Sequence, residues 1–140
     1  MSWAERASER LDEAGYRSGG ARRQVIELLA TEECALTALE MDRLLPAGRA
    51  SIYRTLEQLE QLHLVQRIDI DGEAAGYERL DPGEHHHHLV CEECGVLAPF
   101  EDRALERAID AISRDAEFDV ATHDVILRGR CPRCKAPDLN

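Results

Sequence analysis

Residues 49–62, RASIYRTLEQLEQL, contain the clearest structural signal in the sequence. Their apolar side chains recur at spacings of four, three and three residues, as on one face of an amphipathic helix. These side chains are Ile52, Leu56, Leu59 and Leu62. Polar side chains, among them Tyr53 and Arg54, occupy the other faces. A shorter helix is expected just before, at residues 37–45, because a proline and a glycine follow it. The sequence therefore predicts two closely connected helices, the second with a free polar face.

The flanking segments complete a small unit around this helix pair. Ser2 and Glu5 fit the capping box that begins a helix. The predicted helices are residues 2–14 and 21–31, and the predicted strands of a hairpin are residues 64–70 and 76–80. A turn at Asp71 and Gly72 would join the strands. A pair of helices followed by a β-hairpin is the layout of a winged helix-turn-helix, which we expect over residues 1–80.

A change in composition follows residues 81–84, Asp-Pro-Gly-Glu, which we predict to be a hinge. Beyond it, the apolar patterns predict a strand at residues 85–90, a helix at 102–115 and a strand at 121–127. Residues 85–140 would then form a second, small α/β domain. The expected fold class is α+β.

Four of the five cysteines form two C-x-x-C pairs, Cys91 with Cys94 and Cys131 with Cys134. Each pair turns tightly enough to direct both thiolates at one point, and two such pairs complete a tetrahedral zinc site. Redox pairs or disulfides are less favoured, because two matched pairs are typical of metal ligands in a reducing compartment. We predict a structural zinc that fixes the end of one strand to the C-terminal region. Cys34 stands alone and is expected to be a small buried apolar residue.

Four consecutive histidines, residues 85–88, are unusual in a predicted strand. Side chains alternate between the faces of a strand, so His85 and His87 would share one face, and His86 and His88 the other. Neutral imidazole is a preferred ligand of zinc and related metals, so each pair could be half of a metal site. The remaining ligands must come from elsewhere in the chain. The candidates are His63, Asp81, Glu84, Glu106 and His123.

Charge and hydropathy narrow the possible classes of protein. The net charge of −11 argues against a wholly basic surface, yet residues 16–67 contain as many arginines as acidic residues. DNA affinity depends on local phosphate contacts, so the acidic total does not exclude DNA binding. No apolar run approaches the ~20 residues that span a bilayer, and no signal peptide is recognisable. We expect a cytoplasmic protein with no membrane partner.

Together these motifs resemble the ferric uptake regulator family, and the likeness extends over nearly the whole chain. Its most specific parts are residues 51–56 (SIYRTL) with Leu59, Leu64 and Val65, then residues 85–94, then residues 131–134. The resemblance implies a winged helix-turn-helix joined to an α/β dimerisation domain. It also implies a structural four-cysteine zinc and a second metal that controls DNA binding.

Carried over to this chain, the pattern of the zinc uptake regulators fits best. It implies a regulatory metal site formed by His85, His87, Glu106 and His123. It also implies a further site near the hinge, with His86 and His88 and, as plausible partners, His63 and Asp81. Tyr53 and Arg54 would face DNA, and we include Arg22, Arg49 and Ser51 in the DNA-binding set.

We therefore expect a homodimeric, metal-responsive repressor of metal-homeostasis genes that binds a double-stranded DNA operator, with zinc structural and zinc at the regulatory site. Iron or manganese at that site is an alternative, as is a peroxide sensor of the same family. From other classes, a zinc storage or carrier protein has no use for Tyr53 and Arg54. A metal hydrolase needs an open metal position for water, which four protein ligands do not leave. We therefore expect no enzyme activity and no catalytic residues.

Overall fold

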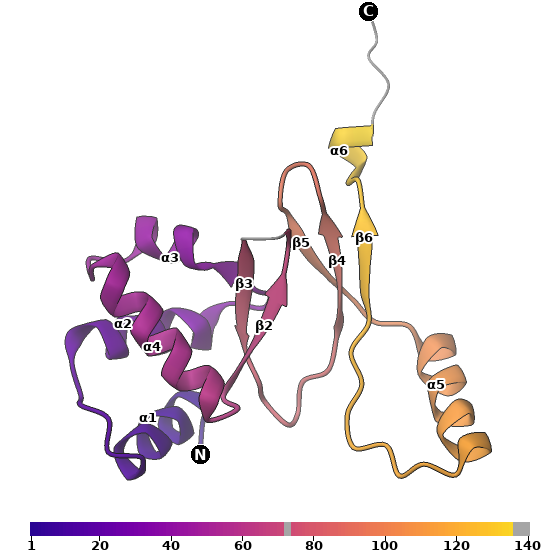
Figure 1. Ribbon diagram of the computed structural model, residues 1–140, viewed down its shortest axis with the longest axis horizontal. Coiled ribbons are helices and arrows are strands. Elements are labelled where there is room, and N and C mark those ends of the chain that lie inside the picture. Colours follow the sequence, from indigo (N-terminus) through magenta and orange to yellow (C-terminus); the bar gives the residue numbers. More distant parts are fainter. Residues whose placement is uncertain (72–73, 136–140) are drawn as a thin grey trace, which may run out of the picture. The chain divides into compact units, whose positions relative to one another are not determined.

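The structure, a computed structural model, describes residues 1–71 and 74–135. Contacts within the chain divide it into two compact units, Met1–Glu84 and His85–Asn140. Figure 1 shows helices and a small sheet in the first unit, and a sheet with one long helix in the second. No helix in the described part of the chain has the length and apolar character needed to cross a membrane.

The first unit contains the predicted helix pair. Its helices are α1 (Trp3–Glu13), α2 (Gly20–Thr31), α3 (Ala38–Leu44) and α4 (Arg49–Gln61). Capping boxes begin α1, at Ser2 and Glu5, and α3, at Thr37 and Glu40. In both, the hydroxyl accepts from one backbone N–H and the carboxylate from another, which satisfies donors that a helix start leaves free.

The wing is a three-stranded antiparallel sheet in the order β1-β3-β2. Its strands are β1 (Leu36–Thr37), β2 (Val65–Asp69) and β3 (Ala75–Arg79). The predicted hairpin is present, with Val65 opposite Arg79. The sequence did not predict β1, because two residues are too few for a strand pattern. Of the predicted turn, Asp71 accepts a hydrogen bond from Ala74 N–H, while Gly72 lies outside the described residues.

One hydrophobic core joins all four helices to this sheet. The predicted stripe of α4 is at its centre, with Ile52 and Leu59 0% exposed and Leu56 1% exposed. Side chains of α1, α2 and α3 complete the core, among them Leu11, Val25, Leu29 and Met41. The first unit is thus a winged helix-turn-helix, and α4, the second helix of the predicted pair, buries only one face.

The second unit is built on the sheet β5-β4-β6. Its elements are β4 (His87–Cys91), β5 (Leu97–Phe100), α5 (Arg103–Ala116), β6 (Ile126–Gly129) and α6 (Pro132–Lys135). The central strand β4 pairs antiparallel with β5 and parallel with β6. The predicted helix is present as α5, and Asp102 begins it by accepting from Leu105 N–H.

Two strand predictions in this unit need correction, and a third strand has no counterpart among the predictions. β4 begins at His87 and not at residue 85, because residues 81–84 form a turn and pairing with β5 starts at His87. β6 begins at Ile126 and not at 121, because its ladder with β4 starts there. β5 was not predicted. It has four residues and contains Pro99, which an edge strand tolerates.

Candidate metal centres and DNA-binding helix

The four paired cysteines converge at one end of the second sheet. Because β4 and β6 run parallel, with Cys91 opposite Gly129, the two C-x-x-C segments leave the sheet at the same end. Gly95 follows the first pair at a φ of 79°, which a residue without a side chain adopts freely. The ligand atoms of the four cysteines all lie within 4.8 Å of one another. The cysteines are Cys91, Cys94, Cys131 and Cys134.

Hydrogen bonds prepare this cluster for a metal. The backbone N–H groups of Cys94 and Cys131 each lie 3.4 Å from the Cys91 Sγ. Together they lower the pKa of Cys91 to about 6, the bond from Cys94 being the larger cause. The pKa of Cys134 is raised, chiefly by its hydrogen bond with Cys131. A metal must therefore displace a proton from some of the four thiols, and an all-sulfur set of this kind fits zinc.

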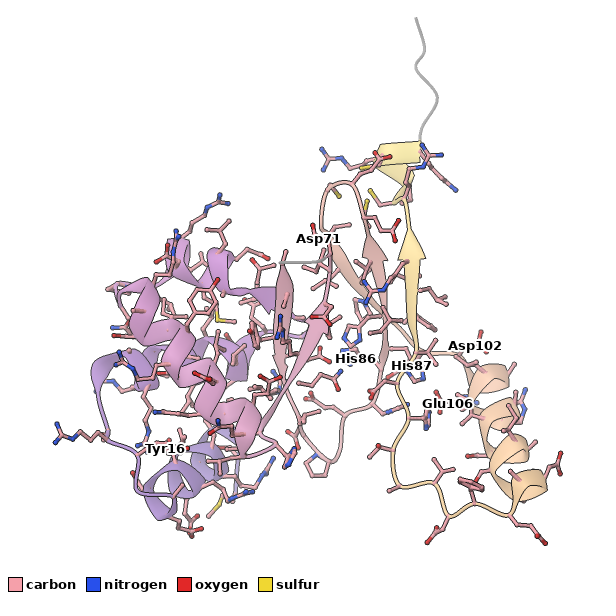
Figure 2. All side chains as sticks on the ribbon, viewed as in Figure 1. Tyr16, Asp71, His86, His87, Asp102 and Glu106 are labelled. Carbon is pink, nitrogen blue, oxygen red and sulfur yellow. The ribbon has the colours of Figure 1, made fainter. Side chains whose placement is uncertain are left out.

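A second cluster combines three imidazoles with one carboxylate. Glu106 is in the first turn of α5, His87 begins β4, and His85 and His123 lie in the segments that precede β4 and β6. The ligand atoms of these four residues also lie within 4.8 Å of one another. Figure 2 shows Glu106 and His87 directed toward each other from α5 and β4. The structure therefore brings together the four residues predicted for the regulatory site.

The carboxylate of Glu106 is the centre of this cluster. Its Oε1 is 2.6 Å from His87 Nε2 and 3.3 Å from His85 Nε2, and its Oε2 is 2.7 Å from His123 Nε2. The hydrogen bond with His87 is the largest cause of a lowered pKa for Glu106, so this group is a carboxylate at neutral pH. Three ring nitrogens and one anionic oxygen are a donor set that suits a divalent metal.

One contributor to this site was not predicted. The backbone N–H of Val125 donates to His87 Nδ1 at 3.2 Å, and so orients the ring with Nε2 toward Glu106. Such outer contacts commonly fix the direction of a metal-binding histidine. No side-chain pattern could have found it, because the donor belongs to the backbone. A cavity of about 530 Å³ opens on this side of the cluster and is lined by Asp102 and Asp110 as well as by three of the ligands, His85, His87 and Glu106.

The residues predicted for the hinge site are distributed over both units. His86 and His88 form a ring pair with centroids 4.8 Å apart. In the first unit, His63 follows α4 with a φ of 57°, and Asp81 pairs with Arg6 at 3.2 Å. A metal site from these four residues stays a prediction.

The exposed face of α4 has the character expected of a DNA-binding helix. Tyr53 is 47% exposed, Arg54 is exposed, and Ser51 is half-buried beside them. Arg49, the first residue of α4, donates from Nε and Nη2 to one oxygen of Asp42, at 3.1 and 2.9 Å. The interaction with Asp42 was not predicted, because residues seven apart on different helices carry no recognisable pattern.

Arg22 occupies a different environment from the other predicted DNA-binding residues. It is only 7% exposed. Its guanidinium donates to the carbonyls of Ser8 and Tyr16 and to the carboxylate of Asp12, at 2.7 to 3.4 Å. Through these hydrogen bonds the Arg22 side chain holds α2 against α1 and against the loop that follows α1. We therefore leave Arg22 out of the DNA surface proposed below.

Comparison with known proteins decides the family. The model of the ferric uptake regulator family matches residues 13–128. The ferric uptake regulation protein of Neisseria meningitidis serogroup A is 33% identical over 132 residues, which are 90% of this chain and 91% of that protein. The chain belongs to the ferric uptake regulator family. Its members are metal-responsive transcription regulators and not enzymes.

Solved structures agree with this assignment. The Vibrio cholerae ferric uptake regulator has a TM-score of 0.75 and 29% identity, over 88% of this chain and 98% of that one. The Helicobacter pylori ferric uptake regulator, described as having three functional metal-binding sites, has a TM-score of 0.83 over 97% and 93% of the two chains. At 21% identity, the second likeness concerns the fold alone.

Proposed function

We propose that this family member is a zinc-responsive, DNA-binding repressor of metal-homeostasis genes that acts in the cytoplasm as a homodimer. The observation that carries the proposal is the convergence of three imidazole Nε2 atoms on the Glu106 carboxylate. Four protein donors of nitrogen and oxygen suit tetrahedral zinc and are a poorer match for a metal that prefers thiolates.

The two clusters have different tasks in this proposal. The four cysteines hold a structural zinc that joins the ends of β4 and β6. His85, His87, Glu106 and His123 hold the regulatory metal, whose charge links three segments of the second unit. A regulatory metal shifts a conformational equilibrium only if it binds the DNA-competent state more tightly. Glu106 belongs to α5 and His123 to the segment before β6, so the positions of these two elements relative to β4 can change when a metal fills the site.

DNA binding is assigned to the exposed face of α4. Tyr53 and Arg54 lie off the buried stripe and are free to enter a major groove, with Ser51 and Arg49 near the start of the helix. In a dimer the two recognition helices meet successive grooves ~34 Å apart, so the operator should be a pseudo-palindrome.

The homodimer is supported by apolar side chains that the second unit leaves exposed. Leu127 is 51% exposed, Ile112 66% and Phe118 73%. Exposed large apolar side chains on several elements of one unit favour an interaction there, and we infer that a second copy of the chain is the partner.

The regulatory assignment is tested by His123→Ala and Glu106→Ala. Each variant should keep the four-cysteine zinc, lose one other zinc, and bind an operator selected from random duplexes only as tightly as metal-free protein does. Asp110→Ala is the matched control, because Asp110 lines the same cavity one turn further along α5 without belonging to the cluster. Zinc-stimulated DNA binding that survives in both variants would move the sensor role to His86 and His88.

Iron is the second candidate for the regulatory metal, because the relatives are named for ferric uptake. Manganese and a peroxide-sensing role belong to the same alternative. Equilibrium titration of protein stripped at the regulatory site with each metal, followed by operator affinity, separates these cases. A storage or carrier role would instead give metal binding with no effect on DNA affinity.

A further inference from the structure

The segment that leaves the winged-helix unit, residues 80–84, is closed on itself and held by backbone hydrogen bonds. Leu80 N–H donates to the Leu64 carbonyl at 2.9 Å, and the indole Nε1 of Trp3 donates to the same oxygen at 2.9 Å. Glu84 N–H donates to the Asp81 carbonyl at 2.9 Å, which closes a turn through Pro82 and Gly83. This turn is part of the first unit, although its composition predicted a hinge.

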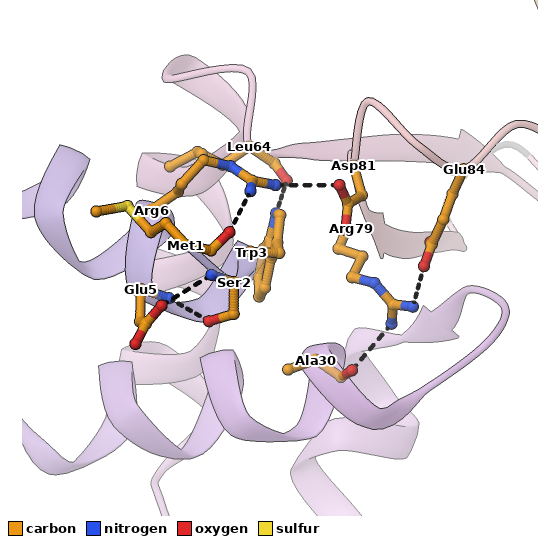
Figure 3. A network of polar contacts seen from close by, with 10 residues as sticks. All are labelled: Met1, Ser2, Trp3, Glu5, Arg6, Ala30, Leu64, Arg79, Asp81 and Glu84. Atoms are coloured by element: carbon orange, nitrogen blue, oxygen red, sulfur yellow. Dashed lines mark hydrogen bonds and ion pairs between the residues drawn. The ribbon is translucent and has the colours of Figure 1, made fainter.

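Two ion pairs fasten the turn to helices and strands of the same unit (Figure 3). Arg6 Nη2 of α1 is 3.2 Å from Asp81 Oδ1. Arg79 Nη2, at the end of β3, is 2.6 Å from Glu84 Oε1. The Arg79 side chain is only 14% exposed, so this second pair is partly shielded from water on one side.

The position of Arg79 does not depend on Glu84. Its Nη1 donates to the carbonyls of Leu29, Ala30 and Glu32 at the end of α2. The last carbonyls of a helix lack intrahelical partners, and a guanidinium with several donors satisfies them together. Arg79 is therefore a fixed cation that joins α2 to β3, and the Glu84 carboxylate accepts from its other terminal nitrogen, Nη2.

We propose that the Arg79–Glu84 pair is a latch that fixes the point at which the chain leaves the winged-helix unit. Glu84 is then a positioning residue for the regulatory site, because His85, the first ligand of that site, is the next residue. Rotational freedom between the units begins after Glu84 and not within residues 81–84. This inference rests on the proposed regulatory role of the histidine cluster.

The latch gives metal binding a fixed point on which to act. If residues 81–84 were free, a change of conformation at His85 would be absorbed by the torsions of the four preceding residues. With Glu84 held, the change is passed to a residue bonded to β3 and, through Arg79, to α2. Loss of the latch should therefore reduce the effect of zinc on DNA affinity, although the protein still binds zinc and still binds DNA.

The test compares Glu84→Gln with Asp69→Asn in the full-length protein. Asp69 pairs with Arg67 at 3.4 Å on β2, in the same unit, and its loss removes a charge without touching residues 80–84. Zinc content, amide hydrogen exchange of residues 80–84, and affinity for an operator selected from random duplexes are measured with and without added zinc. In Glu84→Gln we expect exchange of the Leu80 and Glu84 amides to rise about ten-fold. We also expect the zinc-induced gain in operator affinity to fall by about five-fold or more. Zinc content and zinc-free affinity should stay at the wild-type level, and Glu84→Asp should recover part of the gain.

Three results would overturn the latch. Glu84→Gln could match Asp69→Asn in exchange, or its exchange could rise while the zinc-induced gain in affinity is unchanged. It could also lose the second zinc, which would make Glu84 a ligand and not an anchor. If the operator affinity of the wild-type protein does not change on adding zinc, the proposed function is wrong. The comparison of amide exchange between Glu84→Gln and Asp69→Asn then tests the latch by itself.

Discussion

The two units bury their apolar side chains to very different extents. In the first unit, residues from all four helices and the wing form one core, in which Leu11, Val25 and Ile52 are 0% exposed. In the described part of the second unit, the buried apolar residues are Val90 and Cys91, at 3% and 2% exposed, beside the buried imidazoles of His87 and His88. The helix α5 buries none of its residues completely.

This difference indicates two sources of stability in one chain. The first unit has enough apolar burial to fold by the hydrophobic effect. The second has a three-stranded sheet and one amphipathic helix, too little to form a closed core alone. Under the proposed function, the groups that stabilise its folded state are the metals and a second copy of the chain, since whatever binds only the folded form stabilises it.

The most severe test of this comparison is Cys91→Ser. Structural zinc contributes on the order of 10 kcal/mol in small zinc domains, so this variant should lose the fold of the second unit and the dimer with it. The first unit should keep its structure, and the single tryptophan, Trp3, reports on that unit alone because it is 3% exposed in its core. Tryptophan fluorescence should stay native while amide protection of β4 and β6 is lost. Cys34→Ser, the matched control, should keep both, and a Cys91→Ser protein with normal dimer mass and normal protection would refute the expectation.

The next test removes one leucine from each unit. Leu59→Ala empties a fully buried position of α4 and should lower the free energy of unfolding of the first unit by about 2–5 kcal/mol. Leu127→Ala removes a side chain that is 51% exposed, so it should change the unfolding of a single chain by less than about 0.5 kcal/mol. Its effect should appear in dimer dissociation, measured by analytical ultracentrifugation over a range of concentrations. Equal losses in the two unfolding curves would show that the second unit has a core of its own.

The first unit was also the easier one to predict from the sequence, for the same physical reason. A buried face leaves a periodic pattern, and Ile52, Leu56 and Leu59 therefore specified α4 and its exposed side correctly. The cysteine and histidine spacings were informative for a different reason, since ligand atoms must meet at one point. The structure brings two of the three predicted ligand sets together, the four paired cysteines and the regulatory set of three histidines with Glu106, while the hinge set stays a prediction.

Features that depend on the backbone or on distant partners left no such pattern. β5 is a short edge strand with a proline, and Val125 contributes only its N–H. The sequence predicts Arg22 as a DNA-binding arginine because a sequence gives the charge of a side chain and not its neighbours. The packing of α1 on α2 shows that the Arg22 guanidinium donates to Asp12 and to two backbone carbonyls. The turn at residues 81–84 has the composition of a flexible hinge, and its ion pairs depend on Arg6 and Arg79.

A third test concerns the face of α4 that the core does not use. Arg54→Ala should leave zinc content and stability unchanged, because Arg54 is exposed. Operator affinity should fall by ~1–3 kcal/mol at one base position if the guanidinium contacts a guanine. A phosphate contact would instead weaken all sequences alike and reduce the salt dependence. Arg114→Ala, an exposed arginine on α5, is the charge-matched control and should have no effect on affinity. Unchanged binding of Arg54→Ala at physiological salt would remove this residue from the DNA surface.

The smallest expected effect tests whether the two units unfold independently. Thr37→Ala removes the hydroxyl that accepts from Glu40 N–H at 3.0 Å at the start of α3. Loss of such a cap costs about 1 kcal/mol, and Thr37→Ser should restore most of it because serine presents the same oxygen. The midpoint of denaturation followed by Trp3 fluorescence should move to lower denaturant. Retention of zinc by the four cysteines, followed with a chromogenic chelator in the same samples, should not move, because no part of that site belongs to the first unit. If zinc release and fluorescence shift to the same denaturant concentration, the two units unfold as one cooperative body. The inference from their burial, that each unit has its own source of stability, is then wrong.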